Sequence, residues 1–222
     1  MSTNNNTHSL VTLSDPRSPG AEAYRTLRTN LMFSSLDKPL HTLLVTAPSS
    51  DSDAAGKSET IANLAVTLAQ GGRKTLLVDC DLRRPHQQDI WRLNNDVGLT
   101  SVLLEDGELP LQDVGVENLS VLSSGPQPAN PADLIGSRRM EDLLVRFKKE
   151  ADFVLFDAPP VITVTDATLL ALKLDGVLLV LSAGNTRRDH ATRAKELLEK
   201  VNINVIGAVL NNAPRDSSLG GY

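Results

Sequence analysis

Short apolar runs alternate along the chain with longer segments whose apolar residues recur every three or four positions. The runs cover residues 41–47, 74–79, 119–122, 153–157, 176–182 and 205–210. The helix-like segments cover 19–33, 57–70, 87–93, 99–104, 139–149, 167–174 and 188–200, with a helical turn at 130–136. Nearly continuous apolar runs are typical of strands buried on both faces. The alternation therefore predicts an α/β fold, a doubly wound, mostly parallel sheet with helices on both faces.

Both ends of the chain lack this pattern. Residues 1–17 are rich in Ser, Thr, Asn and Asp, and residues 215–222 end in Gly-Gly-Tyr. Such segments bury little apolar surface, so both are predicted to be flexible tails. The part between them, residues 18–214, has the length of one large α/β domain.

Composition narrows the class of protein. The net charge of −5 argues against binding of a nucleic acid over the whole surface of the protein. Cys80 is the only cysteine, so no internal disulfide can form and a reducing, cytoplasmic setting is expected. No apolar run approaches the ~20 residues of a membrane span, and no signal-peptide core precedes the first helix.

A Gly-Lys-Ser tripeptide, Gly56-Lys57-Ser58, stands between the first predicted strand and the next helix. Strand, loop, Gly-Lys-Ser and helix is the layout of a phosphate-binding P-loop. The N–H groups at the helix start face the phosphates, Lys57 reaches the outer phosphates, and the Ser58 hydroxyl binds Mg²⁺. The motif is incomplete, because Asp51 stands where the usual pattern has its first Gly.

Three acidic residues follow predicted strands. Asp79 and Asp81 come at the end of one, and Asp157 at the end of another. Ligands of parallel sheets bind at this carboxyl edge. Asp157 there holds Mg²⁺ as a Walker B acid, or else caps the next helix. Alternation points Asp79 and Asp81 the same way, so one could hold the metal while the other takes a hydroxyl proton. The alternative is a pair of surface acids neutralised by the arginines at 83 and 84.

Several further motifs, which lie between Glu22 and Asn211, accompany the Gly-Lys-Ser tripeptide and the three acids. They are Glu22-Ala-Tyr-Arg-Thr-Leu-Arg-Thr-Asn-Leu31, Leu76-Leu-Val-Asp-Cys-Asp-Leu-Arg-Arg-Pro85, Asn130-Pro-Ala-Asp-Leu-Ile-Gly136, Phe156-Asp-Ala-Pro-Pro-Val161 and Val209-Leu-Asn211. With Gly56-Lys57-Ser58, this combination resembles the cytoplasmic catalytic domain of the bacterial tyrosine kinases of capsule and exopolysaccharide synthesis. These kinases belong to the MinD/ParA-like P-loop ATPases.

The resemblance implies an ATP- and Mg²⁺-dependent protein tyrosine (auto)kinase that regulates exopolysaccharide biosynthesis. The implied ATP-binding residues are Ala54, Ala55, Gly56, Lys57, Ser58, Glu59, Asn211 and Asn212, the asparagines near the adenine. The implied catalytic residues are Lys57, Asp79 and Asp81, with Asp79 as the base. The implied Mg²⁺ ligands are Ser58, Asp81 and Asp157.

The resemblance also implies partners. Glu22, Arg25 and Arg28 match the stripe through which family members assemble into a ring-like homo-oligomer; the plain interpretation is a solvated face with a Glu22–Arg25 pair. The tail of one subunit then offers Tyr222 to its neighbour as phosphoacceptor, beside other protein tyrosine substrates. A membrane-embedded polysaccharide co-polymerase acts as adaptor and recruits the kinase to the inner face of the plasma membrane.

The tail departs from the family pattern, which typically ends in a cluster of tyrosines. Tyr222 is the only tyrosine in the tail, and Tyr24 is the only other one in the chain. Two other functions therefore stay open. One is a MinD/ParA-like ATPase switch without kinase activity, and the other is a nucleotide-blind oligomeric scaffold.

The loop before Gly56 also departs from the family pattern, Pro-Gly-(Glu or Ala)-Gly-Lys-Ser-Thr. Ala54 replaces a glycine, and Asp51, Asp53 and Glu59 add negative charge. Each charge, a few ångströms from a phosphate, costs on the order of 1 kcal/mol of binding. We predict that restoring Pro-Gly-Glu at positions 53–55 tightens ATP binding measured by calorimetry. Equal affinities for the two proteins would contradict this interpretation of the loop.

Overall fold

The sheet of the computed structural model, which describes residues 10–34, 39–50 and 56–213, has seven strands in the order β3-β4-β2-β5-β1-β6-β7. Neighbouring strands are parallel except β3 and β4, which pair antiparallel. The strands are β1 (Thr42–Thr46), β2 (Thr75–Asp79), β3 (Gln112–Asp113), β4 (Leu119–Leu122), β5 (Phe153–Asp157), β6 (Gly176–Ser182) and β7 (Val205–Asn211).

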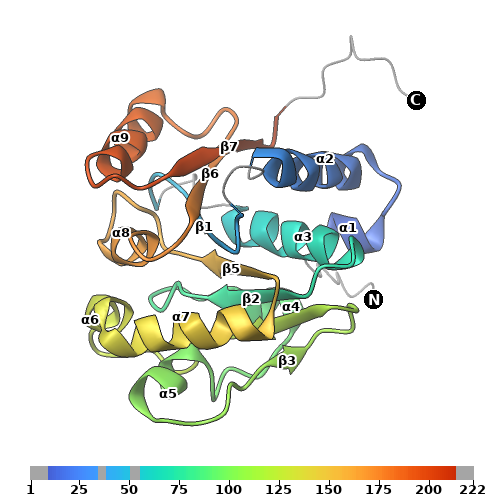
Figure 1. Cartoon of the computed structure of the whole chain (residues 1–222). Helices are drawn as coiled ribbons and strands as arrows, with labels where there is room; N and C mark the ends of the chain where they lie inside the picture. The colour runs from blue at the N-terminus through green and yellow to red at the C-terminus, as the bar shows by residue number, and fades with distance from the viewer. Residues whose placement is uncertain (1–9, 35–38, 51–55, 214–222) are drawn as a thin grey trace, which may run out of the picture.

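Helices cover both faces of this sheet (Figure 1). Side chains of α2 and α3 share a core with one face, together with residues next to α1 and in α4, and α5 to α9 pack on the other. The helices are α1 (Val11–Ser14), α2 (Pro19–Ser34), α3 (Lys57–Gln70), α4 (Gln87–Trp91), α5 (Leu99–Leu104), α6 (Pro131–Gly136), α7 (Arg138–Glu150), α8 (Asp166–Ala171) and α9 (Arg188–Glu199). Within the described ranges, no helix combines the length and the apolar character needed to cross a membrane.

The central strands are apolar throughout because each contributes side chains to two cores. In β1, Leu43 and Val45 belong to the core under α3, whereas Leu44 belongs to the core on the opposite face. All three are at most 1% exposed. Removing such side chains from water on both faces is the main stabilising contribution to a sheet of this kind. The predicted doubly wound α/β fold is confirmed.

The register of the central strands sets their carboxyl ends level with one another. Asp79 at the end of β2 is the Cα partner of Asp157 at the end of β5. Asp157 is also the Cα partner of Val45 in β1, the strand that leads into the loop before α3. The two acids and the start of α3 are therefore brought to the same edge of the sheet.

The start of the chain differs from the predicted tail. Residues 10–17 include the short helix α1, and Leu10 and Thr12 are buried. The Thr12 backbone N–H and hydroxyl both donate to Asn63 Oδ1 of α3, at 3.0 and 2.8 Å. This long-range anchor orders a segment whose local composition is polar. Residues 1–9 and 215–222 lie outside the described part, so their flexibility stays a prediction.

Gly98, directly before α5, lies close to the turn after β4. A Cβ at Gly98 would lie 2.3 Å from both Ser123 O and Gly125 N. Both are backbone atoms that cannot rotate away, so Gly98→Ala must displace the main chain. We predict that it lowers the free energy of unfolding by about 1–3 kcal/mol, as overpacking does, when measured by urea denaturation.

The matched control is Gly107→Ala, because nothing lies within 4 Å of a Cβ at Gly107. Its effect is expected to stay within about 0.5 kcal/mol, as at ordinary surface positions. Similar losses in the two variants would show that the close approach at Gly98 is not the cause.

Candidate active site

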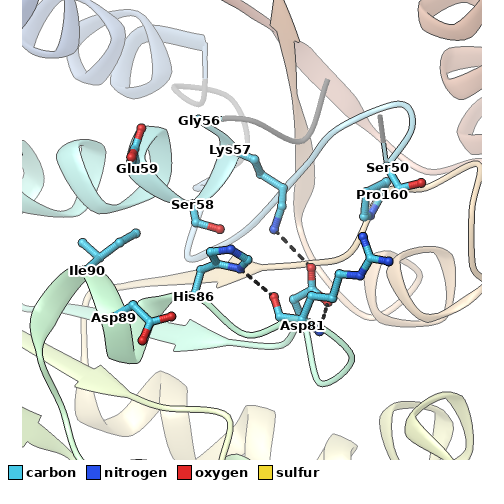
Figure 2. Close-up of a pocket in the computed structure, with 11 residues that line it drawn as sticks. Ser50, Gly56, Lys57, Ser58, Glu59, Asp81, His86, Asp89, Ile90 and Pro160 are labelled. Carbon is cyan, nitrogen blue, oxygen red and sulfur yellow. Dashed lines mark hydrogen bonds and ion pairs between the residues drawn. The ribbon is translucent and has the colours of Figure 1, made fainter. Parts of the chain in front are cut away.

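A cavity of about 690 Å³ lies where the loops after β1, β2 and β5 meet the start of α3 (Figure 2). Its walls combine charged, hydroxyl and apolar groups. The lining residues are Ser50, Gly56, Lys57, Ser58, Glu59, Asp81, Arg84, His86, Asp89, Ile90 and Pro160. Its position at the carboxyl ends of parallel strands is the usual ligand position in doubly wound sheets.

Gly56 forms the turn into α3 and has a left-handed backbone, with φ of 88°. A Cβ here would lie 2.3 Å from Asn211 Nδ2 at the end of β7. Both the conformation and the close contact favour glycine. The N–H groups in the first turn of a helix have no intrahelical partners and attract anions. The start of α3 therefore fits a phosphate group.

Lys57 is the cation at the centre of the site, and only 3% of the residue is exposed. Its Nζ contacts Asp157 Oδ1 closely and lies 3.6 Å from Asp81 Oδ2. Figure 2 shows Lys57 pointing across the cavity toward Asp81. Burial disfavours the charged form, but the Asp157 and Asp81 carboxylates outweigh it and raise the pKa of Lys57. The ammonium is therefore held charged without direct access to bulk water.

Asp79 lies behind the cavity and is 0% exposed. Its Oδ1 accepts the Asp81 N–H at 3.1 Å, and its Oδ2 accepts the N–H groups of His86 and Gln87 at 3.0 and 2.9 Å. Burial and the charge of Asp157 raise the pKa of Asp79 to about 8. Asp79 thus holds both ends of the loop between β2 and α4.

Asp81 lines the cavity, as Asp79 does not. One carboxylate oxygen of Asp81 faces Lys57 and the other accepts the Arg84 N–H at 3.1 Å. Burial raises the pKa of Asp81, while the Lys57 ammonium opposes the shift. The two acids therefore differ in their access to the cavity, which Asp81 lines and Asp79 does not, and their common direction stays a prediction.

The two acids are not surface groups neutralised by the neighbouring arginine side chains. Arg83 instead forms a two-point pair with the buried Asp166 of α8, with Nε–Oδ2 at 2.8 Å and Nη2–Oδ1 at 3.1 Å. Arg84 contributes its backbone N–H to Asp81. The loop after β2 is thereby fixed to α8 as well as to its own strand.

Asp157 ends β5 and is 0% exposed. Its Oδ1 contacts Lys57, and its Oδ2 accepts a hydrogen bond from Gln87 Nε2 at 2.7 Å. The next helix, α8, begins only at Asp166 with Thr165 at its N-cap, so Asp157 does not cap it. The alternative of a helix cap is excluded, and the carboxylate belongs to the polar cluster at the cavity.

Gln87 is the residue of this cluster that the sequence did not single out. It is fully buried and links Asp157 to the Ser58 carbonyl oxygen, at 3.1 Å from its Nε2. Its Oε1 accepts a hydrogen bond from the Trp91 indole N–H at 3.1 Å. The sequence shows that Gln87 follows the acidic motif closely. Its hydrogen bond to Asp157 of β5 is a tertiary contact, which the periodicity of the sequence does not indicate.

The remaining predicted ligand residues divide into three groups. Ser58 and Glu59 line the cavity. Asn211 lies against Gly56, and Asn212 donates to Ser182 Oγ at 3.3 Å, so their place near an adenine stays a prediction. Outside the described residues lie Ala54, Ala55 and Tyr222.

The predicted charged stripe on α2 is split between two roles. Arg25 Nη1 pairs with Glu22 Oε2 at 2.7 Å, and both side chains are solvent-accessible. Arg28 instead donates from Nη1 to the Thr67 carbonyl oxygen of α3 at 2.7 Å. A cation in the last turn of a helix is favoured by the helix dipole. Arg28 therefore stabilises the helix that starts at the P-loop.

The donor set of the cavity fits a magnesium ion bound together with phosphates. Ser58 and Asp81 line the cavity, and Asp157 lies behind Lys57. Mg²⁺ prefers oxygen ligands and commonly takes one or two carboxylates plus phosphate oxygens and waters. Among the residues with assigned positions, no three His, Cys, Asp or Glu side chains form a metal-binding group of their own.

Comparison with known families agrees with this geometry. Residues 47–215 match the ParA family, described as NUBPL iron-transfer P-loop NTPase. The structure of MinD from Pyrococcus horikoshii OT3, solved in complex with Mg-ADP, is similar to this chain with a TM-score of 0.63 at 23% identity. The match covers 77% of this chain and 69% of the MinD chain, and it shows a shared fold. The protein is a P-loop NTPase of the ParA-like class.

Closer relatives define the family within this class. The chain is 42% identical over 204 residues to tyrosine-protein kinase YwqD of Bacillus subtilis (strain 168), covering 91% of this chain and 85% of that protein. It is 38% identical over 209 residues to putative tyrosine-protein kinase CapB of Staphylococcus aureus, covering 93% and 90%. The kinase domain of Escherichia coli tyrosine kinase ETK superimposes with a TM-score of 0.88 at 30% identity, covering 100% and 87%. The chain belongs to the bacterial tyrosine kinase family.

Removing the Lys57 ammonium leaves buried carboxylates without their counter-charge. We predict that Lys57→Met lowers the free energy of unfolding at about pH 7.5 by about 3–5 kcal/mol, the usual cost of breaking a buried pair from one side. Because the pKa of Lys57 is raised above its ordinary value of 10.5, its contribution is fully present below that value. Burial raises the pKa values of Asp79 and Asp81, so without the ammonium these two acids take up protons at lower pH and the deficit should shrink toward about pH 5.

Urea denaturation at the two pH values, without added nucleotide, measures both effects. The control is Lys195→Met, which breaks an exposed pair with Glu199 within α9. Exposed pairs contribute roughly 0–1 kcal/mol, so this variant should unfold almost as the parent does. A Lys57→Met deficit that is absent, or equal at both pH values, would rule out an unbalanced acidic cluster.

Proposed function

We propose that the protein is an ATP- and Mg²⁺-dependent tyrosine kinase that phosphorylates itself and other proteins in the control of capsular or exopolysaccharide biosynthesis. The observation that carries the proposal is the convergence of Lys57, Asp81 and Asp157 at the start of α3. The proposal is supported by the similarity to YwqD, which is named a tyrosine-protein kinase.

In this proposal, the start of α3 binds the phosphates of ATP and Lys57 neutralises the charge that develops on the transferred group. Ser58, Asp81 and Asp157 would hold Mg²⁺, directly or through water, and the ion would supply further neutralisation of the phosphate charge. The cavity walls keep these groups at one place, so positioning carries much of the catalysis.

The acidic pair receives the proton of the tyrosine hydroxyl. Asp81 borders the cavity and lies within reach of a hydroxyl that enters there. Asp79 was predicted to be the base. Its carboxylate accepts three backbone N–H groups, including that of Asp81, so Asp79 also fits a role in fixing the position of Asp81. The proton step therefore belongs to the pair, with Asp81 as the member that faces the substrate.

The proposal also includes assembly of the chain into a homo-oligomer. Glu22 and Arg25 are accessible on α2 and available to a second copy of the chain, whereas Arg28 is engaged with α3. Such an oligomer brings the tail of one subunit to the cavity of the next. A membrane-embedded polysaccharide co-polymerase as adaptor, with recruitment to the inner face of the plasma membrane, follows from family membership alone.

Intact-mass spectrometry with and without Mg-ATP tests the activity. We expect the mass of one phosphoryl group to be added, with fragmentation placing it on Tyr222. The modification should be lost in Tyr222→Phe and Lys57→Met and kept in Tyr24→Phe, because Tyr24 is partly buried in α2 beside Glu59 and Asn63 of α3.

The other outcomes distinguish the alternative functions. ADP formation without any phosphotyrosine would support the ATPase switch instead of the kinase. If calorimetry shows no heat of ATP binding in either the parent protein or Lys57→Met, the nucleotide-blind scaffold would replace both enzymatic functions.

A further inference from the structure

The side chain of Gln87 connects segments that the P-loop and the acidic motifs supply separately. Its Nε2 lies 2.7 Å from Asp157 Oδ2 at the end of β5 and 3.1 Å from the Ser58 carbonyl oxygen in α3. Its backbone N–H donates to Asp79 Oδ2 at 2.9 Å, at the end of β2. One residue of α4 therefore contacts all three parts of the site.

The orientation of the Gln87 amide is fixed by its neighbours. The two hydrogens of Nε2 have two acceptors, a carboxylate and a carbonyl oxygen. The amide oxygen has a donor, the Trp91 indole N–H at 3.1 Å. A flipped amide would place its oxygen against Asp157 and its NH₂ group against the indole N–H, so only one orientation satisfies every group.

These contacts matter because Lys57, which also contacts Asp157, is expected to bind the phosphates of the nucleotide as well. Lys57 is the group that must serve the phosphates, and it contacts Asp157 Oδ1. Gln87 bonds to the opposite oxygen, Oδ2, and is 0% exposed. It can keep the carboxylate in one orientation when the ammonium turns to a ligand.

We propose that Gln87 is a positioning residue that holds Asp157 in the orientation required for the Mg²⁺–nucleotide complex, and that Trp91 reports on this arrangement. The inference rests on the proposed function and assigns a specific group to it. Hydrogen bonds to the ligands of a metal orient them, and their loss typically costs about 10–100-fold in metal affinity or activity.

The first test compares Gln87→Leu with Gln88→Leu in the full chain. The two glutamines are adjacent in α4, but Gln88 donates to the Pro85 carbonyl oxygen and to Asp89 and does not contact Asp157. ADP formation is measured over a range of ATP and Mg²⁺ concentrations. In Gln87→Leu, kcat should fall about 10–100-fold and the Mg²⁺ requirement should rise, with little change in the KM for ATP. Gln88→Leu should behave as the parent protein does.

Gln87→Glu separates the hydrogen bond from simple packing. The substitution nearly preserves volume and places a second negative charge against Asp157 at a buried position, where like charges repel strongly. Its kcat should fall below that of Gln87→Leu. Trp91→Phe removes the donor that fixes the amide, together with part of the packing of the indole against the core, but keeps the bond from Gln87 to Asp157, so its loss should be smaller than that of Gln87→Leu.

Fluorescence gives a readout that does not depend on turnover. Trp91 is the only tryptophan of the chain, so emission reports this position alone. Adding Mg-ADP to the parent protein should shift the emission, because the ligand acts on Asp157 and Gln87 transmits the change to the indole. In Gln87→Leu the shift should disappear while calorimetry still detects Mg-ADP binding.

The outcomes separate this inference from the function on which it rests. If the parent protein neither binds nor consumes Mg-ATP, the proposed function fails and the role of Gln87 fails with it. If the parent is active and Gln87→Leu has the same kcat and Mg²⁺ requirement, only the inference is overturned. Equal losses in Gln87→Leu and Gln88→Leu would also overturn it, since they would indicate a general effect on α4. Should Gln87→Leu not fold, Gln87→Glu and Trp91→Phe carry the same comparison.

Discussion

The buried ion pair between Lys57 and the acids Asp81 and Asp157 is the constraint on which the rest of the site depends. A charge with only 3% of its residue exposed is stable only if opposite charge and hydrogen bonds surround it. The fold provides that environment by setting β2 and β5 in register at their carboxyl ends and by starting α3 beside them. A shift of either strand by one residue would turn its acid toward the other face of the sheet.

The polar cluster rests on two apolar cores that hold it rigid. Leu44 and Phe156 pack on one face of the sheet, whereas Val45 and Leu155 pack on the other. The loop after β2 receives its own restraints, from the Asp79 carboxylate at the end of β2 and from the Arg83–Asp166 pair with α8. Precision in the site therefore comes from elements that lie outside the cavity and do not touch a ligand.

Much of this architecture can be predicted from the sequence, because it depends on local patterns. The bounds of α3 agree with the prediction at both ends, since Gly56 precedes the helix and Gly71 follows it. The acids after β2 and β5 were predicted to meet because parallel strands share an edge. Prediction from the sequence succeeds wherever the periodicity of a segment and its turn residues indicate the same structure.

The parts that were missed depend on contacts between distant segments. The helix α1 forms in a polar stretch because Asn63 of α3 bonds to Thr12. Arg28 looks like a member of a surface stripe until the end of α3 is placed beside it. Gln87 carries no motif, and β3 has only two residues. No local pattern indicates the contacts of Thr12, Arg28 and Gln87, since their partners lie far away along the chain, and β3 is too short to show a strand pattern.

The charge of the cluster favours the proposed binding of a nucleotide together with a cation. Three carboxyl groups, Asp79, Asp81 and Asp157, surround the single ammonium of Lys57, so the cluster is negative even if Asp79, with its pKa raised to about 8, keeps a proton. A polyphosphate brings further negative charge into a site of low dielectric, where repulsion is strong. Lys57 cannot neutralise both the acids and the phosphates. A divalent cation held by the acids would supply the missing positive charge, and the orientation of Asp157 toward it would depend on Gln87, which bonds to its Oδ2.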